Sequence, residues 1–366
     1  MVRALLGWVS SARIIAQIAG KWQSEEGRGG GRQTGFTGFA GLALQDGASI
    51  GGVQARSWSP LLGKRTNPPA AALAAAGQSR KSRESCPSSP PLLARRPGGA
   101  YTRSDPKEDD LAIIVKSAGE LATMREAGRI NALALDAAVR AVRPGVTTRE
   151  LDAIAEDAIR SHGGTPAFLG YPNRSYPGHP YPATINASID GELVHGIPSD
   201  RRLVEGQILS IDCGTIYRGY VGDSAVTVPV GRIAPEAERL LEVTREALRL
   251  AIDACRVGRR LGDVSAAIQE WVEGQGYQVV REYTGHGVGR TMHEDPQVPN
   301  WGTRDRGPRL RAGMTLALEP MVTIGPPDLY VKDDYWTVAT RDGGLSAHFE
   351  HTVAITDGEP QILTVP

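Results

Sequence analysis

Five side chains of metal-ligand type are spread over the second half of this 366-residue sequence, each in an apolar or glycine-flanked run. Burying a single unpaired carboxylate costs several kcal/mol, so burying four together requires cations that neutralise their charge. Four carboxylates and one imidazole on strand-like segments are typical of a hydrolytic site that holds two hard divalent metal ions. The five residues are Asp212, Asp223, His286, Glu319 and Glu350.

The two aspartates belong to a predicted β-hairpin. Asp212 and Asp223 each end a short, mainly apolar run. A hairpin that turns around Tyr217-Arg218 would place the two aspartates directly opposite each other on one face of the sheet. Like charges in that position are destabilising, so we expect a cation between them. A different register, with two polar edge residues, is the alternative.

The other three candidate ligands lie further along the chain. His286 belongs to a segment with three glycines, where a helix is unfavourable and the backbone can approach a ligand closely. Glu319 and Glu350 each interrupt an apolar strand, and glutamate is rarely fully buried unless it is paired. The alternatives are a structural histidine and two glutamates at exposed strand ends. An exposed position at a strand end is plausible for one of the two glutamates and much less so for both.

Helices with clear start signals precede these strands. Capping boxes begin at Ser117 and at Thr147, each with a glutamate three residues later. Apolar residues then recur at helical spacing until Pro-Gly or Gly-Gly ends the pattern. The four predicted helices cover about 118–142, 148–163, 235–255 and 263–274.

The two helix pairs indicate an internal repeat. A shift of 113 residues aligns Gly145 with Gly258 and Gly163 with Gly276. Each helix pair is followed by strand-like sequence, which predicts two α-plus-antiparallel-sheet halves related by a pseudo-twofold axis. A site enclosed between the two sheets would then receive ligands from both halves. Chance alignment of two capped helix pairs is the alternative.

The charge is divided unevenly along the chain. Residues 1–107 hold 15 Lys and Arg against 5 Asp and Glu, whereas residues 108–366 hold 26 against 36. The first segment is low in complexity and rich in Gly and Pro, so we predict a disordered basic extension. An organellar targeting segment or a non-functional upstream extension is the alternative. No pattern in it indicates specific nucleic-acid binding, although a basic tail can contact ribosome surfaces weakly.

Other bulk properties limit the class of protein. The hydrophobic fraction of 40% is sufficient for a sizeable core. Three cysteines without paired spacing favour a reducing compartment and exclude a disulfide framework or a zinc ribbon. No apolar run approaches the length of a membrane span, so we expect no membrane association. A cytoplasmic monomer is the simplest expectation.

Residues 108–366 resemble the type I methionine aminopeptidases of peptidase family M24, whose pita-bread fold is of the α+β class. Six motifs in family order carry this resemblance, and there is no room for the helical insertion of the type II enzymes. The motifs are Val194-His-Gly-Ile-Pro198, Ile211-Asp212 with Gly222-Asp-Ser-Ala225, Gly285-His-Gly-Val-Gly289 with Met292-His-Glu-Asp-Pro296, Leu318-Glu-Pro-Met321, Asp334-Tyr-Trp-Thr337 and Leu345-Ser-Ala-His-Phe-Glu-His-Thr352.

The resemblance implies roles for the five ligands. Asp212 binds one metal ion, and Asp223 and Glu350 bridge both ions. The remaining two residues, His286 and Glu319, complete the coordination of the other ion. Two divalent ions per chain are expected, from the group Co, Mn, Fe(II) and Zn. The implied reaction removes the initiator methionine from the N-terminus of nascent polypeptides, with preference for a small second residue. In that reaction a metal-activated hydroxide attacks the scissile carbonyl.

The resemblance also implies catalytic and substrate-binding residues. Glu319 is expected to transfer the proton, His293 to stabilise the oxyanion, and His195 to contact the substrate near the scissile amide. His195 and His293 therefore count as substrate-binding residues as well. The methionine pocket corresponds to Tyr171, Tyr181, Met292 and Trp336. The alternative for His195 is a structural turn residue.

Three features depart from the family pattern. Asn186 stands where many type I members have a pocket cysteine, and His348 stands where a glutamine is common. The loop 172–180 is longer than usual. Two other functions compete with methionine removal, namely an Xaa-Pro hydrolase of the same fold and a non-catalytic binding module. The Xaa-Pro enzymes carry a folded N-terminal domain, and binding modules lose metal ligands.

Overall fold

The computed structural model describes residues 112–366, so the predicted basic extension 1–107 lies outside the described residues. All four predicted helices are confirmed, and both capping boxes, at Ser117 and Thr147, are present. The last helix begins two residues before its predicted start. The helices are α2 (Ala118–Ala141), α3 (Thr148–Ser161), α4 (Pro235–Ala254) and α5 (Leu261–Gly274). None of the helices described is long and apolar enough to cross a membrane.

The strands form antiparallel sheets, two of which are large. In the first, β5 pairs with one edge of β4, and β1 and β2 share the other edge. The second has the order β15-β14-β9-β7-β8. The first sheet contains β1 (Thr165–Pro166), β2 (Ile185–Ile189), β4 (Ile208–Tyr217) and β5 (Tyr220–Pro229). The second contains β7 (Thr284–Gly287), β8 (Glu294–Pro299), β9 (Thr315–Leu318), β14 (His351–Ala354) and β15 (Gln361–Ile362).

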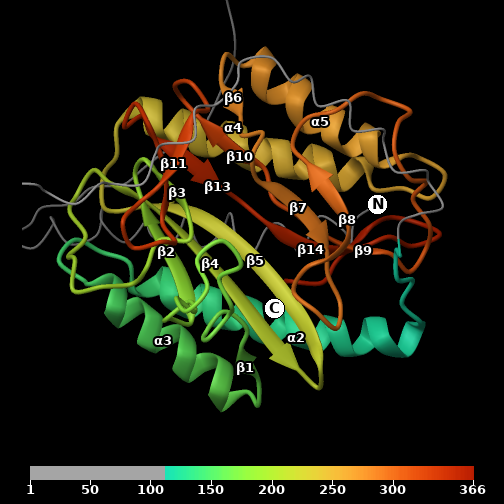
Figure 1. Cartoon of the computed structure of the whole chain (residues 1–366), viewed down its shortest axis with the longest axis horizontal. Helices are drawn as coiled ribbons and strands as arrows, with labels where there is room; N and C mark the ends of the chain where they lie inside the picture. The colour runs from blue at the N-terminus through green and yellow to red at the C-terminus, as the bar shows by residue number, and fades with distance from the viewer. Residues whose placement is uncertain (1–111) are drawn as a thin grey trace, which may run out of the picture. The chain divides into compact units, whose positions relative to one another are not determined.

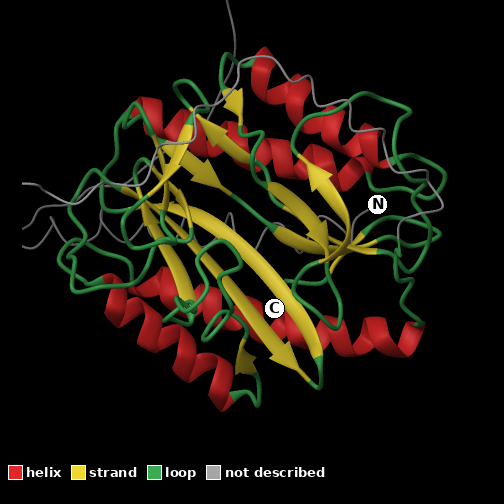
Figure 2. Ribbon diagram, viewed as in Figure 1, coloured by secondary structure: helices red, strands yellow, loops and turns green. Residues whose placement is uncertain are grey.

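Two small sheets complete the strand layer. One has the order β13-β10-β6 and the other has the order β11-β12-β3. Their strands are β3 (Glu192–Val194), β6 (Gln278–Val279), β10 (Met321–Thr323), β11 (Leu329–Val331), β12 (Val338–Thr340) and β13 (Ser346–His348). The helices lie on the two outer sides of the strands, with α2 and α3 on one side and α4 and α5 on the other (Figures 1 and 2).

Each helix pair forms its own hydrophobic core with the neighbouring sheet. Leu151 and Ile159 of α3 are fully buried against Ile185 and Leu209 of the first sheet. In the second half, α4 and α5 pack on β9 and β14. The main side chains of that second core are Leu240, Val264, Ile268, Leu316 and Val353. The strands are therefore covered on their outer faces, which leaves the space between the two halves for a site.

The predicted internal repeat is confirmed by matching backbone geometry. Gly145 and Gly258 have φ values of 90° and 88°, and their N–H groups donate to the carbonyls of Leu203 and Leu310. The repeat extends into the strands. Gly206 and Gly313 have φ values of 95° and 89° and each precedes a strand. Asp212 and Glu319 each lie six residues beyond these glycines and so occupy equivalent positions.

The predicted register of the β4–β5 hairpin is wrong by two residues. Asp212 pairs with Ala225, and Asp223 pairs with Gly214. The turn is formed by Arg218-Gly219, with φ values of 48° and 77°. A two-residue turn with both residues in the left-handed region matches the twist of the strands, and glycine supplies it at low cost. Because the partner changes by two residues, both aspartates remain on one face of the sheet, but they lie diagonally rather than directly opposite.

Helix α2 crosses β5 at a point where each of these two elements has a glycine. A Cβ atom at Gly222 would lie 2.6 Å from the Cα atom of Gly128. This close approach holds the strand segment that carries Asp223 against the helix. The helix backbone is also packed closely against a third segment, because a Cβ atom at Gly128 would lie 2.3 Å from the carbonyl oxygen of Leu363.

We therefore expect Gly222→Ala to lower the free energy of unfolding by about 1–3 kcal/mol, because an added methyl group must separate the helix from the strand. Gly119→Ala is the matched control, since nothing lies within 4 Å of a Cβ atom at that position. The control should leave stability unchanged or raise it slightly. Urea unfolding of both variants measures the difference. Equal stability of the two variants would contradict the close contact between helix and strand.

Candidate active site

Three of the candidate ligands lie in one row across the strands. Asp212 pairs with Ala225 on the hairpin, and the backbone groups of Ala225 and Glu350 exchange two hydrogen bonds of 3.3 Å and 2.9 Å. The register between β9 and β14 then places Glu319 beside Glu350. Because paired residues in antiparallel strands share a face, the side chains of Asp212, Glu350 and Glu319 point into the same space.

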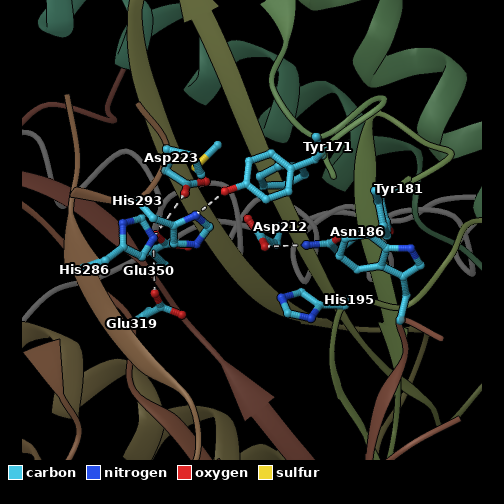
Figure 3. A pocket seen from close by; sticks show the side chains of 13 residues that line it. Tyr171, Tyr181, Asn186, His195, Asp212, Asp223, His286, His293, Glu319 and Glu350 are labelled. Atoms are coloured by element: carbon cyan, nitrogen blue, oxygen red, sulfur yellow. Dashed lines mark hydrogen bonds and ion pairs between the residues drawn. The ribbon is translucent and has the colours of Figure 1, made fainter. Parts of the chain in front are cut away.

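The other two candidate ligands lie in the next row. The Thr352 hydroxyl accepts a hydrogen bond from the Asp223 N–H (3.1 Å) and donates one to the Asp223 carbonyl (2.8 Å). Thr352 pairs with Ala317, and Ala317 pairs with His286. Strand pairing thus brings together all five residues that the sequence predicts as ligands, although they come from distant parts of the chain (Figure 3).

His286 presents a free nitrogen to the carboxylates. Its Nδ1 atom lies 2.9 Å from the carbonyl oxygen of Gly287, which can only accept a hydrogen bond, so Nδ1 carries the proton. The Nε2 atom lies 3.8 Å from Asp223 Oδ2 and 3.6 Å from Glu319 Oε1. Burial lowers the pKa of His286 to about 3, which keeps the imidazole neutral and its lone pair available.

The carboxylates repel one another in a buried environment. Burial raises the pKa of Glu319, and burial together with neighbouring acidic groups raises the pKa values of Asp223 and Glu350. Burial is also the main cause that raises the pKa of Asp212 to about 6. A carboxylate cluster of this kind is stable at neutral pH only when cations are present.

Buried oxygens without hydrogen-bond partners give an independent test of whether cations fit. Within the described residues, Asp212 Oδ1, Asp223 Oδ1 and Glu350 Oε1 have no partner. Ligand atoms of Asp223, His286 and Glu350 lie within 4.8 Å of one another, close enough to share an ion. Buried polar atoms are normally satisfied, and carboxylate oxygens with an imidazole nitrogen suit divalent first-row metals. The residues therefore fit divalent metal ions.

An aromatic pocket opens beside the carboxylates. The cavity has a volume of about 140 Å³, and its lining includes all four residues predicted for the methionine pocket: Tyr171, Tyr181, Met292 and Trp336. The rings of Tyr181 and Trp336 meet edge to face with centroids 5.1 Å apart. Phe168 also lines the pocket and was missed by the sequence analysis; an aromatic residue three positions before Tyr171 was the available signal.

The two predicted catalytic histidines also face this cavity. His293 Nδ1 lies 2.7 Å from the Tyr171 hydroxyl, and the His293 ring centroid lies 4.4 Å from that of His286. His195 has a φ of 59°, which is uncommon for a residue with a side chain, and its ring contacts Trp336 edge to face. Burial lowers the pKa values of His293 and His195, the latter to about 4.

The departures from the family pattern have defined contacts. The Asn186 amide donates a hydrogen bond of 2.7 Å to Asp212 Oδ2, so Asn186 orients a candidate ligand as well as lining the pocket. The loop 172–180 contacts the pocket wall, because the Trp336 indole N–H donates to the carbonyl of His179 at 2.8 Å.

Glu294 is a structural residue of the site that the sequence analysis missed. Its carboxylate accepts hydrogen bonds from the N–H groups of Arg290 and Thr291 at 2.7 Å and 3.3 Å. The other oxygen lies 2.6 Å from Lys116 Nζ, and both side chains are at most 5% exposed. This buried ion pair fixes the loop that carries His293. The only signal in the sequence is that Glu294, a charged residue, directly follows the candidate catalytic residue His293.

Comparisons with known proteins agree with this geometry. The sequence profile of Metallopeptidase family M24 matches residues 122–357. The methionine aminopeptidase of Clostridium acetobutylicum is 48% identical over 254 residues, which cover 69% of this chain and 99% of that protein. The crystal structure of a methionine aminopeptidase from Thermotoga maritima is similar, with a TM-score of 0.66 and 43% identity over 69% of this chain and 99% of its own.

A prolidase from Pyrococcus furiosus shares the fold with a TM-score of 0.56, at 24% identity and over 65% of its length. The expected α+β pita-bread fold is confirmed by these structural neighbours. The match to methionine aminopeptidases extends over almost their whole length, whereas the match to the prolidase covers 65% of that protein. The chain therefore belongs to metallopeptidase family M24 and, within it, to the methionine aminopeptidases.

Proposed function

We propose that this chain removes the N-terminal methionine from nascent polypeptides by metal-dependent hydrolysis, with residues 108–366 as the catalytic unit. The observation that carries the proposal is a cluster of carboxylates in which three buried oxygens have no hydrogen-bond partner within the described residues, and which directly adjoins an aromatic pocket containing Met292. An unbranched thioether side chain suits such a pocket, because flexible and aromatic groups pack well around sulfur. The names of the relatives support the same reaction.

The cations are proposed to be two divalent ions from the group Co, Mn, Fe(II) and Zn. When bound, they would lower the pKa of a water molecule and polarise the scissile carbonyl. Asp212 would hold one ion, His286 and Glu319 the other, and Asp223 and Glu350 would contact both. We further propose that the enzyme acts as a monomer in the cytoplasm, near the ribosome, and prefers substrates with a small second residue.

Glu319 is the proposed proton carrier. In the metal-free protein, burial raises the pKa of its carboxyl group, so the group has a greater affinity for protons than an exposed glutamate. In this role, Glu319 accepts the proton of the attacking water and passes it to the leaving amine. Glu319 Oε1 lies 3.6 Å from His286 Nε2, which places the carboxylate beside the proposed ions.

His293 is proposed to stabilise the oxyanion. Burial raises the pKa of Tyr171, so its hydroxyl remains protonated and can donate to His293 Nδ1. That assignment places the imidazole proton on Nε2, where it can donate to the carbonyl oxygen as negative charge develops. His195 lines the same cavity with a neutral ring and is proposed to contact the substrate near the scissile amide.

The substrate class is tested with two peptides. The enzyme supplied with Co(II) or Mn(II) should release methionine from Met-Gly-Met-Met and should not cleave an Ala-Pro dipeptide. The pocket beside the carboxylates predicts this result, because it offers aromatic rings and a thioether to the first side chain. Amino-acid analysis of the products measures both reactions. Faster cleavage of the Ala-Pro peptide would favour an Xaa-Pro hydrolase instead.

Removal of a bridging carboxylate should abolish activity. We expect Asp223→Ala to lower kcat/KM for Met-Gly-Met-Met by more than roughly 1000-fold, and to lower metal content, because Asp223 is proposed to contact both ions. Asp357→Ala is the matched control, since it also removes an aspartate carboxylate but Asp357 is exposed and outside the ligand cluster. If Asp223→Ala stayed within about tenfold of wild type, or about 1.4 kcal/mol in barrier, the bridging role would be wrong.

Cation binding should stabilise the protein more strongly as the pH rises. The folded-state pKa of Asp212 is raised to about 6, above its unfolded value. In the metal-free protein this group therefore favours folding below the unfolded pKa, and that contribution is lost as the pH rises through about 6. At higher pH, bound cations would neutralise the carboxylates in place of the protons that these groups have lost.

Urea unfolding with Co(II), and separately with a chelator, should thus show a larger difference at about pH 7.5 than at about pH 5. Asp212→Asn, which cannot ionise, should show a smaller increase between the two pH values. A cation effect that is equal at both pH values in the wild type would argue against raised carboxylate pKa values at the binding site.

A further inference from the structure

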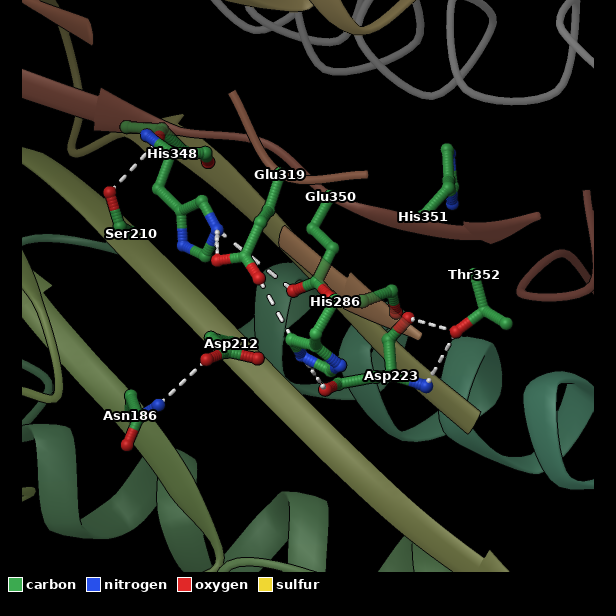
Figure 4. A network of polar contacts seen from close by, with 12 residues as sticks. Asn186, Ser210, Asp212, Asp223, His286, Glu319, His348, Glu350, His351 and Thr352 are labelled. Atoms are coloured by element: carbon green, nitrogen blue, oxygen red, sulfur yellow. Dashed lines mark hydrogen bonds and ion pairs between the residues drawn. The ribbon is translucent and has the colours of Figure 1, made fainter. Parts of the chain in front are cut away.

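A second imidazole faces the carboxylate cluster. His348 is 2% exposed, and its Nε2 atom has no hydrogen-bond partner within the described residues. This atom lies 3.6 Å from Glu319 Oε2 and 3.9 Å from Glu350 Oε2, beyond hydrogen-bond range (Figure 4). Because buried polar atoms are normally satisfied, an unpaired ring nitrogen that faces two carboxylates indicates a missing partner between them.

The position of His348 is fixed by the backbone. The Thr227 hydroxyl donates to the His348 carbonyl at 2.8 Å and accepts from the His348 N–H at 2.9 Å. Thr352 holds Asp223 with the same pair of hydrogen bonds, at 2.8 Å and 3.1 Å. In both cases a threonine hydroxyl takes the place of a backbone-to-backbone hydrogen bond between β5 and the segment that contains β13 and β14.

These two arrangements are equivalent under the internal repeat. Thr227 and Thr352 are 125 residues apart, and so are Asp223 and His348. The directly paired residues Ala225 and Glu350 between them have the same separation. His348 therefore occupies, in the second half, the position that the candidate bridging ligand Asp223 occupies in the first half.

The two histidines lie on opposite sides of the carboxylate row. Asp212, Glu350 and Glu319 form the central row, with His286 in the row on one side and His348 in the row on the other (Figure 4). Glu319 lies between the two imidazoles, with Oε1 3.6 Å from His286 Nε2 and Oε2 3.6 Å from His348 Nε2.

We propose that His348 Nε2 is a second imidazole ligand of the metal centre and shares an ion with Glu319 and Glu350. This inference rests on the proposed metal-dependent function. Two donor atoms that are each about 2.1 Å from a tetrahedral ion lie about 3.4 Å apart, close to the observed separations. A second imidazole shifts the preference of a site away from Mn and Mg and toward Co, Fe(II) and Zn.

Co(II) bound to the full-length protein provides a readout that does not depend on activity. A histidine that binds Co(II) through Nε2 retains an exchangeable Nδ1 proton, whose NMR signal the paramagnetic ion shifts far from the normal range. The wild-type protein should show two such signals, one from His286 and one from His348. His286→Asn and His348→Gln should each remove one signal, and His348→Gln should weaken Co(II) affinity roughly 10–100-fold in calorimetry.

His351→Gln is the matched control. His351 is a partly buried histidine of the same segment, but its Nδ1 atom lies 2.8 Å from Thr364 Oγ1 and its side chain is separate from the carboxylates (Figure 4). This variant should keep both shifted signals and the wild-type affinity. The number of signals in the wild type decides the question even if His348→Gln does not fold.

A single shifted signal in the wild type, lost in His286→Asn, would overturn the proposal and leave the metal centre with one imidazole. Unchanged Co(II) affinity and two remaining signals in a folded His348→Gln variant would overturn it as well. Failure of the wild type to bind Co(II) is a different result, because it would overturn the proposed metal-dependent function itself.

Discussion

Mutual repulsion among buried carboxylates is the constraint on which this structure depends. The two halves meet where Ala225 pairs with Glu350, and this pairing brings Asp212, Glu350 and Glu319 into one row. Without cations, the same contact that joins the halves would concentrate negative charge between them, as the raised carboxyl pKa values indicate. Cations in the site would therefore stabilise the fold and supply the chemistry through the same interactions.

The internal repeat explains why the ligands come from such distant positions. Asp212 and Glu319 are equivalent, so each half contributes a carboxylate from the same point on its strand. Asp223 and His348 are also equivalent, but they differ in chemistry. A site between two related halves can thus keep a symmetric backbone while its side chains diverge, which gives two unlike sides to a cavity that binds an asymmetric substrate.

Local sequence signals predicted the helices and the candidate ligands, but they did not predict the register. Capping residues act within one turn, and a carboxylate in an apolar run is visible in the sequence. The hairpin register depends on which residues adopt the left-handed turn, and Arg218-Gly219 was displaced by one residue in the prediction. The surroundings of the His348 side chain depend on pairing between strands that are distant in the sequence. The sequence could therefore identify His348 as unusual, but it could not show that Nε2 has no hydrogen-bond partner within the described residues.

Charge balance argues for two ions. Four carboxylates carry four negative charges, which two divalent ions would neutralise and one ion would not. A neutral imidazole such as His286 or His348 adds a donor atom without changing this balance. Deprotonation of a water molecule in the neutral cluster would then leave excess negative charge unless a nearby group keeps the proton. Glu319, which is largely buried and lies between the two imidazoles, is the carboxylate best placed to keep it.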